Sequence, residues 1–307
     1  MTATTREIFE KYEVRKTKKQ KSAFIDYVRG VAEGAGCRVT VEKKGRARNI
    51  VIGDVSQAKV VFAAHYDTCP VLPFPNFITP KCVAIYVLYQ IALVAAFLLV
   101  AFAIGFAAGL LTAALDLPAA VASTAGSLCY WVLLVLLLAG PANKHTANDN
   151  TSGVTAVLDI MLAMPEAERA KAAFVLFDLE EVGLIGSSAF AKAHKNEMKD
   201  KLLVNFDCVS DGEDIIFALR KGAKAHAAAL EAAFAPNGTY RVEVAAKGIF
   251  YPSDQMNFPC GVGVAALRRT RKGLLYMNRI HTKRDTVYNE ANIAFLKDGA
   301  LRLTERL

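Results

Sequence analysis

Short apolar runs alternate with amphipathic stretches along most of the chain. The runs at 59–64, 172–177 and 202–207 are apolar over nearly their whole length. Such runs are typical of strands that are buried on both faces of a sheet. Between them, residues 17–34 and 152–164 carry apolar side chains at helical spacing. The pattern therefore predicts strands that alternate with helices.

The other predicted elements continue this alternation. We expect further strands at 38–42, 49–53, 215–219, 241–245, 262–267 and 274–277. We expect further helices at 187–194, 223–235 and 289–303. Strands that alternate with helices favour a central, mostly parallel mixed sheet with helices on both faces. The predicted fold class is therefore α/β, with a three-layer αβα architecture.

One long segment departs from this pattern because it is almost free of charge. From Cys82 to Asn143, Asp116 is the only charged residue in 62 positions. Apolar stretches at 83–115 and 119–140 each provide the roughly 20 residues that cross a bilayer core. Because backbone groups in lipid must be bonded internally, we expect a transmembrane helical hairpin that turns near Asp116. The alternative is a hairpin buried in a soluble core, but core helices usually carry a polar stripe and these do not.

The hairpin divides the rest of the chain into two segments of one domain. We predict that residues 1–80 and 144–307 form this domain and that residues 81–143 form the inserted hairpin. The remainder, roughly 245 residues, is ample for one α/β domain. Lys81 and Lys144 flank the hairpin, whose turn has no Lys or Arg. By the positive-inside rule, both termini and the domain are expected on the cytoplasmic side of the membrane.

Charge and cysteine usage limit the partners and the compartment. Outside residues 82–143 there are 37 basic and 28 acidic residues. Basic groups at 15–21 and 268–272 could contact anionic headgroups, although charge runs are more often solvated surface. We expect no nucleic-acid partner, because no basic motif interleaved with aromatic residues occurs. The first 21 residues predict no signal peptide, and the six cysteines without paired spacing suggest reduced thiols.

Two imidazoles and three carboxylates stand in contexts that suit metal binding. They are His65, Asp149, Glu181, Asp207 and His281. His65, Glu181 and Asp207 each follow an apolar strand at its carboxyl end, which is where ligands bind in open α/β sheets. Such a set can hold two zinc ions with coordination positions left for water. The sequence therefore predicts a di-metal site.

Three of these residues also have a plainer explanation. Asp149 could cap the helix that follows it, and a lone strand-end aspartate such as Asp207 is usually a turn residue. Glu180 and Glu181 could both be solvent-facing loop acids. Adjacent glutamates after a strand can, however, point in different directions, so that one binds metal while its neighbour handles protons.

The carboxylate of Asp67 lies two residues after His65. It could accept the second ring N–H of His65 and so fix the tautomer that binds metal. Asp285 could orient His281 in the same way. The sequence has no Gly-x-Ser-x-Gly motif, so a serine nucleophile lacks support.

In this order, residues 59–67 and 147–286 resemble the co-catalytic zinc aminopeptidases of peptidase family M28. That family includes bacterial leucyl aminopeptidases and, more distantly, glutamate carboxypeptidase and glutaminyl cyclase. The motifs are specific jointly, although none is specific alone. The resemblance implies the zinc exopeptidase type of αβα fold, two Zn²⁺ ions, and hydrolysis of the N-terminal residues of peptide substrates.

The resemblance also implies how the ligands are shared. His65 and Asp207 would hold one zinc ion. Glu181 and His281 would hold the other, and Asp149 would bridge them.

It further implies roles for the neighbouring residues. Glu180 would be the catalytic general base, and Asp67 would support His65. The bond between Asp149 and Asn150 is expected to be cis. Residues 253–254 resemble a Ser-Asp stretch that shapes the substrate pocket.

Two features depart from the family pattern. Relatives join the first histidine to the bridging aspartate by a short loop, whereas 83 residues separate His65 from Asp149 here. Most studied relatives are secreted, whereas this domain is predicted to face the cytosol. The cyclase branch uses one zinc and a different residue after the bridging aspartate, so Asn150 favours peptide hydrolysis. We expect a membrane-anchored di-zinc aminopeptidase; the alternative is a catalytically inactive binding or scaffold protein on the same fold.

Overall fold

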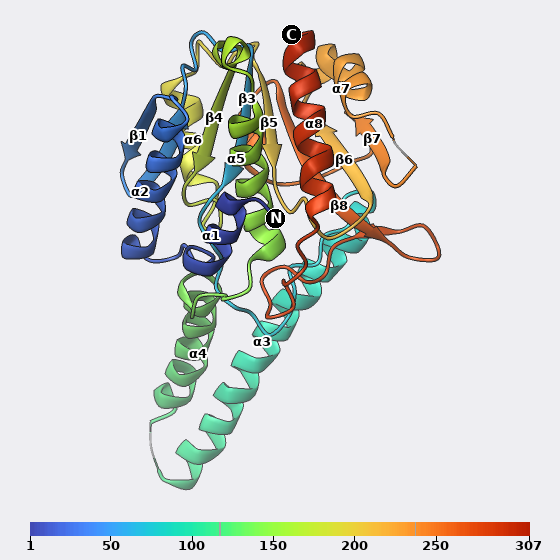
Figure 1. Ribbon diagram of the computed structural model, residues 1–307. Helices are drawn as coiled ribbons and strands as arrows, with labels where there is room; N and C mark the ends of the chain where they lie inside the picture. The colour runs from blue at the N-terminus through green and yellow to red at the C-terminus, as the bar shows by residue number, and fades with distance from the viewer. Residues whose placement is uncertain (117, 237) are drawn as a thin grey trace.

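The computed structural model describes residues 1–116, 118–236 and 238–307, and its strands join in one mixed sheet (Figure 1). The order is β1-β2-β4-β3-β5-β8-β6-β7, with β9 paired to β8. The strands are β1 (Val39–Lys44), β2 (Ala47–Ile52), β3 (Val60–His65), β4 (Ala172–Phe177), β5 (Leu202–Phe206), β6 (Asp214–Leu219), β7 (Arg241–Ala245), β8 (Gly261–Arg269) and β9 (Leu275–Tyr276). Every predicted strand is present.

The middle of the sheet is parallel and its flanks are mixed. β4, β3, β5 and β8 run in the same direction, whereas β2 and β6 are antiparallel to their inner neighbours. β3, β4 and β5 are buried at every residue, which agrees with their continuous apolar sequences. Because these strands are parallel, their carboxyl ends meet at one edge of the sheet, with His65 in register with Phe177.

Helices cover both faces of the sheet. The helices are α1 (Ala3–Lys11), α2 (Lys18–Gly34), α5 (Gly153–Ala163), α6 (Ile185–Ala193), α7 (Ala227–Ala233) and α8 (Glu290–Arg306). Phe62 points into a core shared with α2, α5, α7 and α8, whereas its neighbour Val61 points into a core with Phe190 of α6. This alternation follows from the two-residue period of a strand. The three-layer αβα architecture is therefore confirmed.

Short helical turns complete the domain. They are a π-helical turn at Ala147–Ser152 and 3-10 turns at Glu166–Lys171, Lys221–His226 and Asp254–Asn257. Helix α1 is not among the elements that the sequence predicts. Its segment is mostly polar, and Thr5 and Ile8 are its buried residues. The side chain of Thr2 caps this helix by accepting a hydrogen bond from the Thr5 amide.

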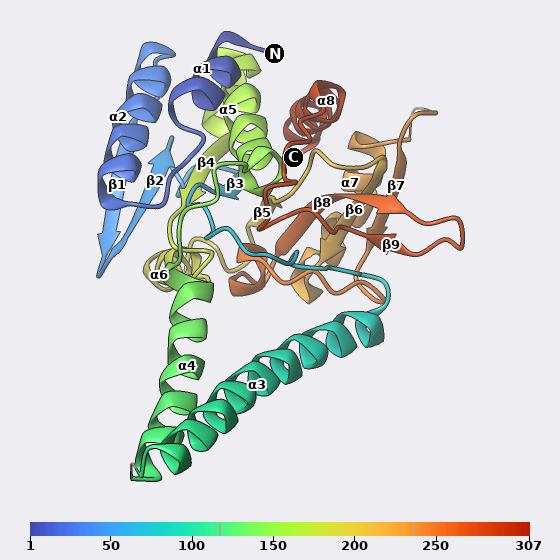
Figure 2. The same ribbon diagram turned by 90° about the horizontal axis from the view of Figure 1, so that it is seen from below.

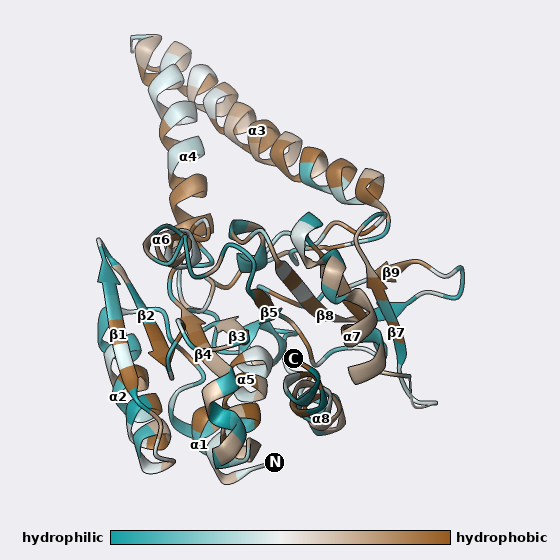
Figure 3. Ribbon diagram, turned by 90° about the horizontal axis from the view of Figure 1, so that it is seen from above, coloured by the Kyte–Doolittle hydropathy of each residue, from teal (hydrophilic) through white to brown (hydrophobic). Residues whose placement is uncertain are grey.

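The uncharged segment forms two long helices that project from the domain (Figures 1 and 2). α3 (Val83–Ala114) and α4 (Ala120–Ala139) agree with the predicted spans, while Leu117 of the predicted turn lies outside the described residues. Both are long and apolar enough to cross a membrane. In the most apolar 18-residue stretch of each helix, 6% of the residues of α3 and 0% of those of α4 are buried inside the protein. The core helices of a soluble protein would be mostly buried, so this exposure argues against that alternative. Figure 3 shows apolar residues along most of α3 and at the domain end of α4.

Candidate metal centre

The carboxyl edge of the parallel strands brings the predicted ligands together. His65 ends β3, Asp207 follows β5, and Glu181 lies in the turn after β4. Asp149 lies in the π-helical turn that precedes α5, and His281 lies in the loop between β9 and α8. Segments that are far apart in sequence therefore meet where open α/β sheets bind their ligands.

The donor atoms form two groups that share Asp149. His65 Nε2 lies 3.3 Å from Asp149 Oδ1 and 3.5 Å from Asp207 Oδ1. His281 Nε2 lies 3.2 Å from Asp149 Oδ2 and 3.2 Å from Glu181 Oε2. Each oxygen of Asp149 thus faces a different histidine. Ligand atoms about 2.05 Å from a tetrahedral zinc ion are about 3.3 Å apart, so this spacing fits zinc.

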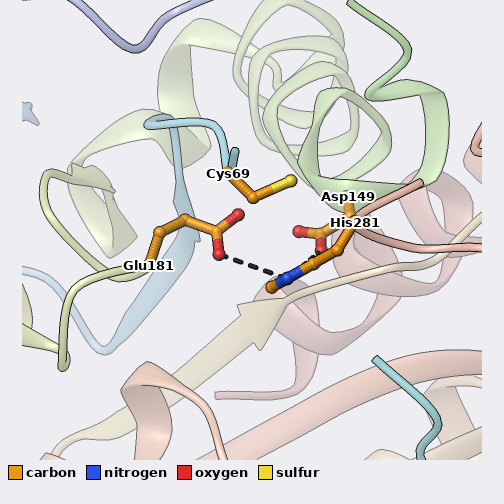
Figure 4. A group of neighbouring side chains, drawn as sticks. All are labelled: Cys69, Asp149, Glu181 and His281. Atoms are coloured by element: carbon orange, nitrogen blue, oxygen red, sulfur yellow. Dashed lines mark ion pairs between the residues drawn. The ribbon is translucent and has the colours of Figure 1, made fainter. Parts of the chain in front are cut away.

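The second group includes a thiol that the sequence analysis did not select. Cys69 lies with Asp149, Glu181 and His281, and the candidate donor atoms all lie within 4.8 Å of one another. Figure 4 shows the carboxylates of Glu181 and Asp149 directed toward the His281 imidazole, with the Cys69 thiol beside them. Burial, reinforced by Glu181, raises the pKa of this thiol well above its usual range. Its sequence context carries no metal-binding spacing that could have marked it.

The electrostatics of the cluster also suit a divalent cation. Burial alone would lower the pKa of His65, but the carboxylates of Glu180, Asp149 and Asp207 outweigh it and raise the pKa well above its usual value. In addition, Glu181 Oε1 is buried and has no hydrogen-bond partner among the described residues. Carboxylates are thus in excess around the imidazoles, and a cation would balance them. The residues present therefore fit zinc.

Left-handed backbone conformations occur next to three of the ligands. Leu179, two residues before Glu181, has a φ of 59°, and Cys208, directly after Asp207, has a φ of 58°. His281 itself has a φ of 62°. Such values are uncommon for residues other than glycine and often occur at functional sites. At these residues the backbone turns sharply, at or close to the ligand residues.

Asn150 and Asp285 hold the loop of Asp149. The Asp149–Asn150 peptide bond is cis, as the resemblance implies. The Asn150 side chain donates to the Phe206 carbonyl at 3.0 Å and accepts from the Gly153 amide at 3.0 Å. Asp285 accepts from the backbone amides of Asn148 at 2.8 Å and of Asp149 at 3.0 Å. Its carboxylate therefore supports Asp149, whereas the sequence suggested His281.

Asp67 supports two parts of the cluster. Its carboxylate accepts hydrogen bonds from the backbone amides of Glu180 at 3.0 Å and Glu181 at 3.3 Å. His65 Nδ1 lies 3.1 Å from the Asp67 carbonyl oxygen but 3.7 Å from its carboxylate. Because a carbonyl only accepts, the neutral His65 ring carries its proton on Nδ1 and presents Nε2 to the other donors. The predicted support of His65 thus comes from the backbone, and the carboxylate positions the glutamates.

Glu180 lies next to the donor groups without belonging to either. Burial raises its pKa well above the usual value, and repulsion from Asp254 and Asp207 adds to this effect. Asp254 is itself fully buried, which raises its pKa to about 7. Ser253 accepts a hydrogen bond from the Asn205 side chain at 3.0 Å. An uncommitted, protonatable carboxylate therefore stands beside the cluster.

Two of the basic residues considered for lipid contact have a structural role. Arg15 is fully buried, and it donates to the Tyr66 carbonyl at 2.6 Å and to the Thr151 hydroxyl at 3.1 Å. Lys21 is buried and pairs with Asp178 at the end of β4. These cations brace the segments that carry the candidate ligands, so they are not available to headgroups.

Comparison with known proteins identifies relatives of this arrangement. The family model of Peptidase family M28 matches residues 134–300, which include every ligand predicted from the sequence except His65. A comparison with curated proteins found no sequence match.

Solved structures share the fold at low sequence identity. The LapA aminopeptidase of Legionella pneumophila has a TM-score of 0.58 and 12% identity, over 98% of this chain and 69% of that chain. A leucine aminopeptidase precursor from Bacteroides thetaiotaomicron has a TM-score of 0.57 and 15% identity, over 99% of this chain and 95% of that chain. A glutaminyl cyclase from Porphyromonas gingivalis has a TM-score of 0.56 and 14% identity, over 99% and 95% of the respective chains.

Proposed function

The chain belongs to peptidase family M28, and from this premise we propose that it is a membrane-anchored zinc aminopeptidase with two metal sites. The observation that carries the proposal is the position of Asp149, whose two oxygens face two separate groups of donors at 3.2–3.3 Å. This geometry is what a carboxylate that bridges two cations requires. The catalytic domain would comprise residues 1–80 and 144–307, with residues 81–143 as its transmembrane anchor.

The proposed ligands form two sets that share one residue. His65 and Asp207 would hold one zinc ion, Glu181 and His281 the other, and Asp149 both. When bound, such a pair lowers the pKa of a shared water and polarises the scissile carbonyl.

Glu180 is the proposed general base. Its carboxylate accepts the proton of the attacking water and returns it to the nitrogen of the leaving amine. Asp67 positions the base, because its carboxylate binds the backbone amide of Glu180.

Cyclisation of N-terminal glutamine is the second candidate. It is favoured by the fold, since a glutaminyl cyclase is matched with a TM-score of 0.56, close to the 0.58 of an aminopeptidase. The paired donor groups around Asp149 favour hydrolysis, because the resemblance implies a single zinc in the cyclase branch. The two reactions leave different organic products, because hydrolysis releases a free amino acid, whereas cyclisation leaves a pyroglutamyl peptide and releases ammonia.

A substrate panel tests the proposal. Purified wild-type protein, Glu180→Gln and the exposed control Glu231→Gln would be assayed with aminoacyl amides and with glutaminyl peptides. We expect the wild type and the control to release amino acids, and Glu180→Gln to lose about 10²–10⁴-fold in rate. Ammonia release from glutaminyl peptides alone would favour the cyclase. Wild-type protein without metal or turnover would favour an inactive scaffold.

A further inference from the structure

The two apolar helices form a V whose open end faces the domain. Near the turn they touch through small residues, since a Cβ on Gly105 would lie 3.5 Å from the Cα of Gly126 and one on Gly109 would lie 3.7 Å from the Cβ of Ala122. Small residues at such a crossing let two backbones approach closely. From this contact α3 and α4 diverge toward the sheet (Figures 2 and 3).

A pocket of about 220 Å³ lies in the open end of the V. Both helices line it with apolar residues at helical spacing: Leu93, Val94 and Phe97 of α3, and Leu133, Leu134 and Leu137 of α4. Asn76, Gln90 and Tyr130 add polar atoms, and among the described residues no Asp, Glu, Lys or Arg lines it. The pocket therefore disfavours a charged side chain, which would lose its hydrating water there and find no Asp, Glu, Lys or Arg to pair with.

One wall of this pocket is a candidate metal ligand. His281 lines the pocket, while its Nε2 faces Asp149 and Glu181 at 3.2 Å. His281 therefore belongs both to the lining of the pocket and to the candidate metal centre.

The segments that lead into and out of the hairpin are bonded to the loop of His281. Leu72 donates its amide to the His281 carbonyl at 2.7 Å, and Asn76 donates to the Ile280 carbonyl at 3.3 Å. The Asn143 side chain donates to the Thr282 carbonyl at 3.0 Å. These bonds fix the pocket relative to the centre.

Resting on the proposed function, we propose that the hairpin pocket binds the side chain of the N-terminal residue of the substrate and selects large apolar residues on peptides held at the membrane. The side chain nearest the scissile bond is the substrate group that would reach past His281. A volume of about 220 Å³ equals roughly seven water molecules. It is smaller than the ~300–1,000 Å³ of sites that enclose a whole small molecule, and it suits one side chain such as Leu or Phe.

The pocket would lie at the membrane, because the helices that line it are long and apolar enough to cross a bilayer. Phe97 packs edge-on against Phe74 of the entry segment, with ring centroids 5.7 Å apart. The pocket is thus continuous from the apolar helices to the domain. A peptide adsorbed at the bilayer surface would present its apolar N-terminal residue to this opening without first entering water.

Filling the pocket tests the inference. The protein in lipid nanodiscs would be assayed as the zinc-loaded wild type, as Phe97→Trp and Leu134→Trp, which add volume from either helix, and as the control Leu99→Trp. Leu99 is 67% exposed on α3 and does not line the pocket. We expect both filling variants to lose at least about tenfold in kcat/KM for leucine and phenylalanine amides relative to alanine amide. The control should keep the wild-type ratio.

A second measurement does not depend on turnover. A leucine-sized photo-crosslinking amino acid at position 93 of the Glu180→Gln protein, where Leu93 lines the pocket, should capture a C-terminally biotinylated Leu-Gly-Gly peptide, and the same group at position 99 should not. Excess Leu-Gly-Gly should compete, and excess Ala-Gly-Gly should compete at least about tenfold less well. Equal capture at both positions, or no capture at either, would overturn the inference.

The kinetic outcomes separate the inference from the proposed function. If the wild type hydrolyses leucine and alanine amides and the filling variants lose both equally, or neither, the pocket inference is wrong while the function stands. If the wild type hydrolyses no amide, the proposed function is wrong and the inference fails with it.

Discussion

Asp149 determines the candidate centre because each of its oxygens faces a different histidine. Its own position depends on two residues outside the donor set, Asp285 and Asn150. Asp285 fixes the backbone on the N-terminal side of Asp149, and the Asn150 side chain ties the C-terminal side to the end of β5. We conclude that the geometry of the donors is set by buried hydrogen bonds to the backbone.

The support from Asp285 can be tested by substitution. Asp285→Asn removes one of two acceptors for the amides of Asn148 and Asp149. We expect zinc affinity, measured by competition with a chelator, to fall about 10–100-fold, while all ligands remain. The exposed Asp298→Asn is the control. Unchanged affinity in Asp285→Asn would show that the loop holds its shape without this carboxylate.

The residues that the sequence analysis selected share a simple context. His65, Asp207 and the Glu180–Glu181 pair follow apolar strands, so the strand pattern itself places them at one edge. Cys69 could not be selected in this way, because it lies in a loop with no local signal. The hydrogen bond from His65 Nδ1 to the Asp67 carbonyl oxygen depends on the orientation of one peptide group, which a sequence does not specify.

Among the elements, α5 and β5 meet closely at Gly153. A Cβ there would lie 2.2 Å from the Phe206 carbonyl oxygen and 2.4 Å from the Asn150 side chain. Gly153→Ala must therefore push the helix away from the strand, and we expect a loss of about 1–3 kcal/mol in stability, measured by thermal unfolding.

Gly30 provides the matched control for this change. It lies within α2, and a Cβ there would meet no atom within 4 Å. Gly30→Ala should therefore gain about 0.5–1 kcal/mol, because alanine loses less backbone entropy in a helix. Similar effects of the two changes would contradict the close contact at Gly153.

Three strands meet at Asp214, which makes their stability depend on pH. Asp214 of β6 has a 4% exposed side chain, and it accepts hydrogen bonds from Arg241 of β7 at 2.7 and 2.8 Å and from Arg269 of β8. Burial alone would raise the pKa of Asp214, but these cations outweigh it and lower the pKa. A lowered folded pKa stabilises the protein above the unfolded value, about 3.9, and this contribution is lost as the pH falls through the folded value.

Thermal unfolding at several pH values checks this dependence. Asp214→Asn should lower Tm at pH 7, and its difference from the wild type should shrink below about pH 4. Asp26→Asn, whose side chain is 74% exposed, should change little at any pH. A difference of the same size at pH 7 and pH 3 would mean that the charge of Asp214 is not the cause.

Secondary structure could be predicted from the sequence wherever a buried face of a strand or helix makes apolar residues recur at a regular spacing. The nine predicted strands and the two long spans are present in the described residues, with ends within a few positions. Helix α1 was missed because two buried residues, Thr5 and Ile8, leave no clear period. The strand order could not be read from the pattern, since it depends on contacts between distant segments.

For the whole molecule, the two apolar helices leave and rejoin the rest of the chain at the rim of the candidate centre. α3 is about 48 Å long at 1.5 Å per residue, which exceeds the roughly 30 Å core of a bilayer. A helix of this length is long enough to cross a membrane with some tilt. The divergence of α3 from α4 agrees with such a tilt (Figure 1).

Reporter fusions test the proposed orientation. The positive-inside rule predicts that a fluorescent protein at the C-terminus fluoresces and that alkaline phosphatase at the same position stays inactive in a bacterial host. Phosphatase inserted after Asp116, at the turn of the hairpin, should be active. Activity of the C-terminal phosphatase fusion would place the domain on the opposite side.

The measurement that tests the central claim most directly is the zinc content of the purified protein, with and without the proposed bridge. Mass spectrometry of metals should find about two zinc ions per wild-type chain. Asp149→Ala should lose both ions, because it removes one donor from each group, whereas the exposed Asp26→Ala should keep them. One zinc ion in the wild type, or two retained in Asp149→Ala, would contradict a pair of cations joined by this carboxylate.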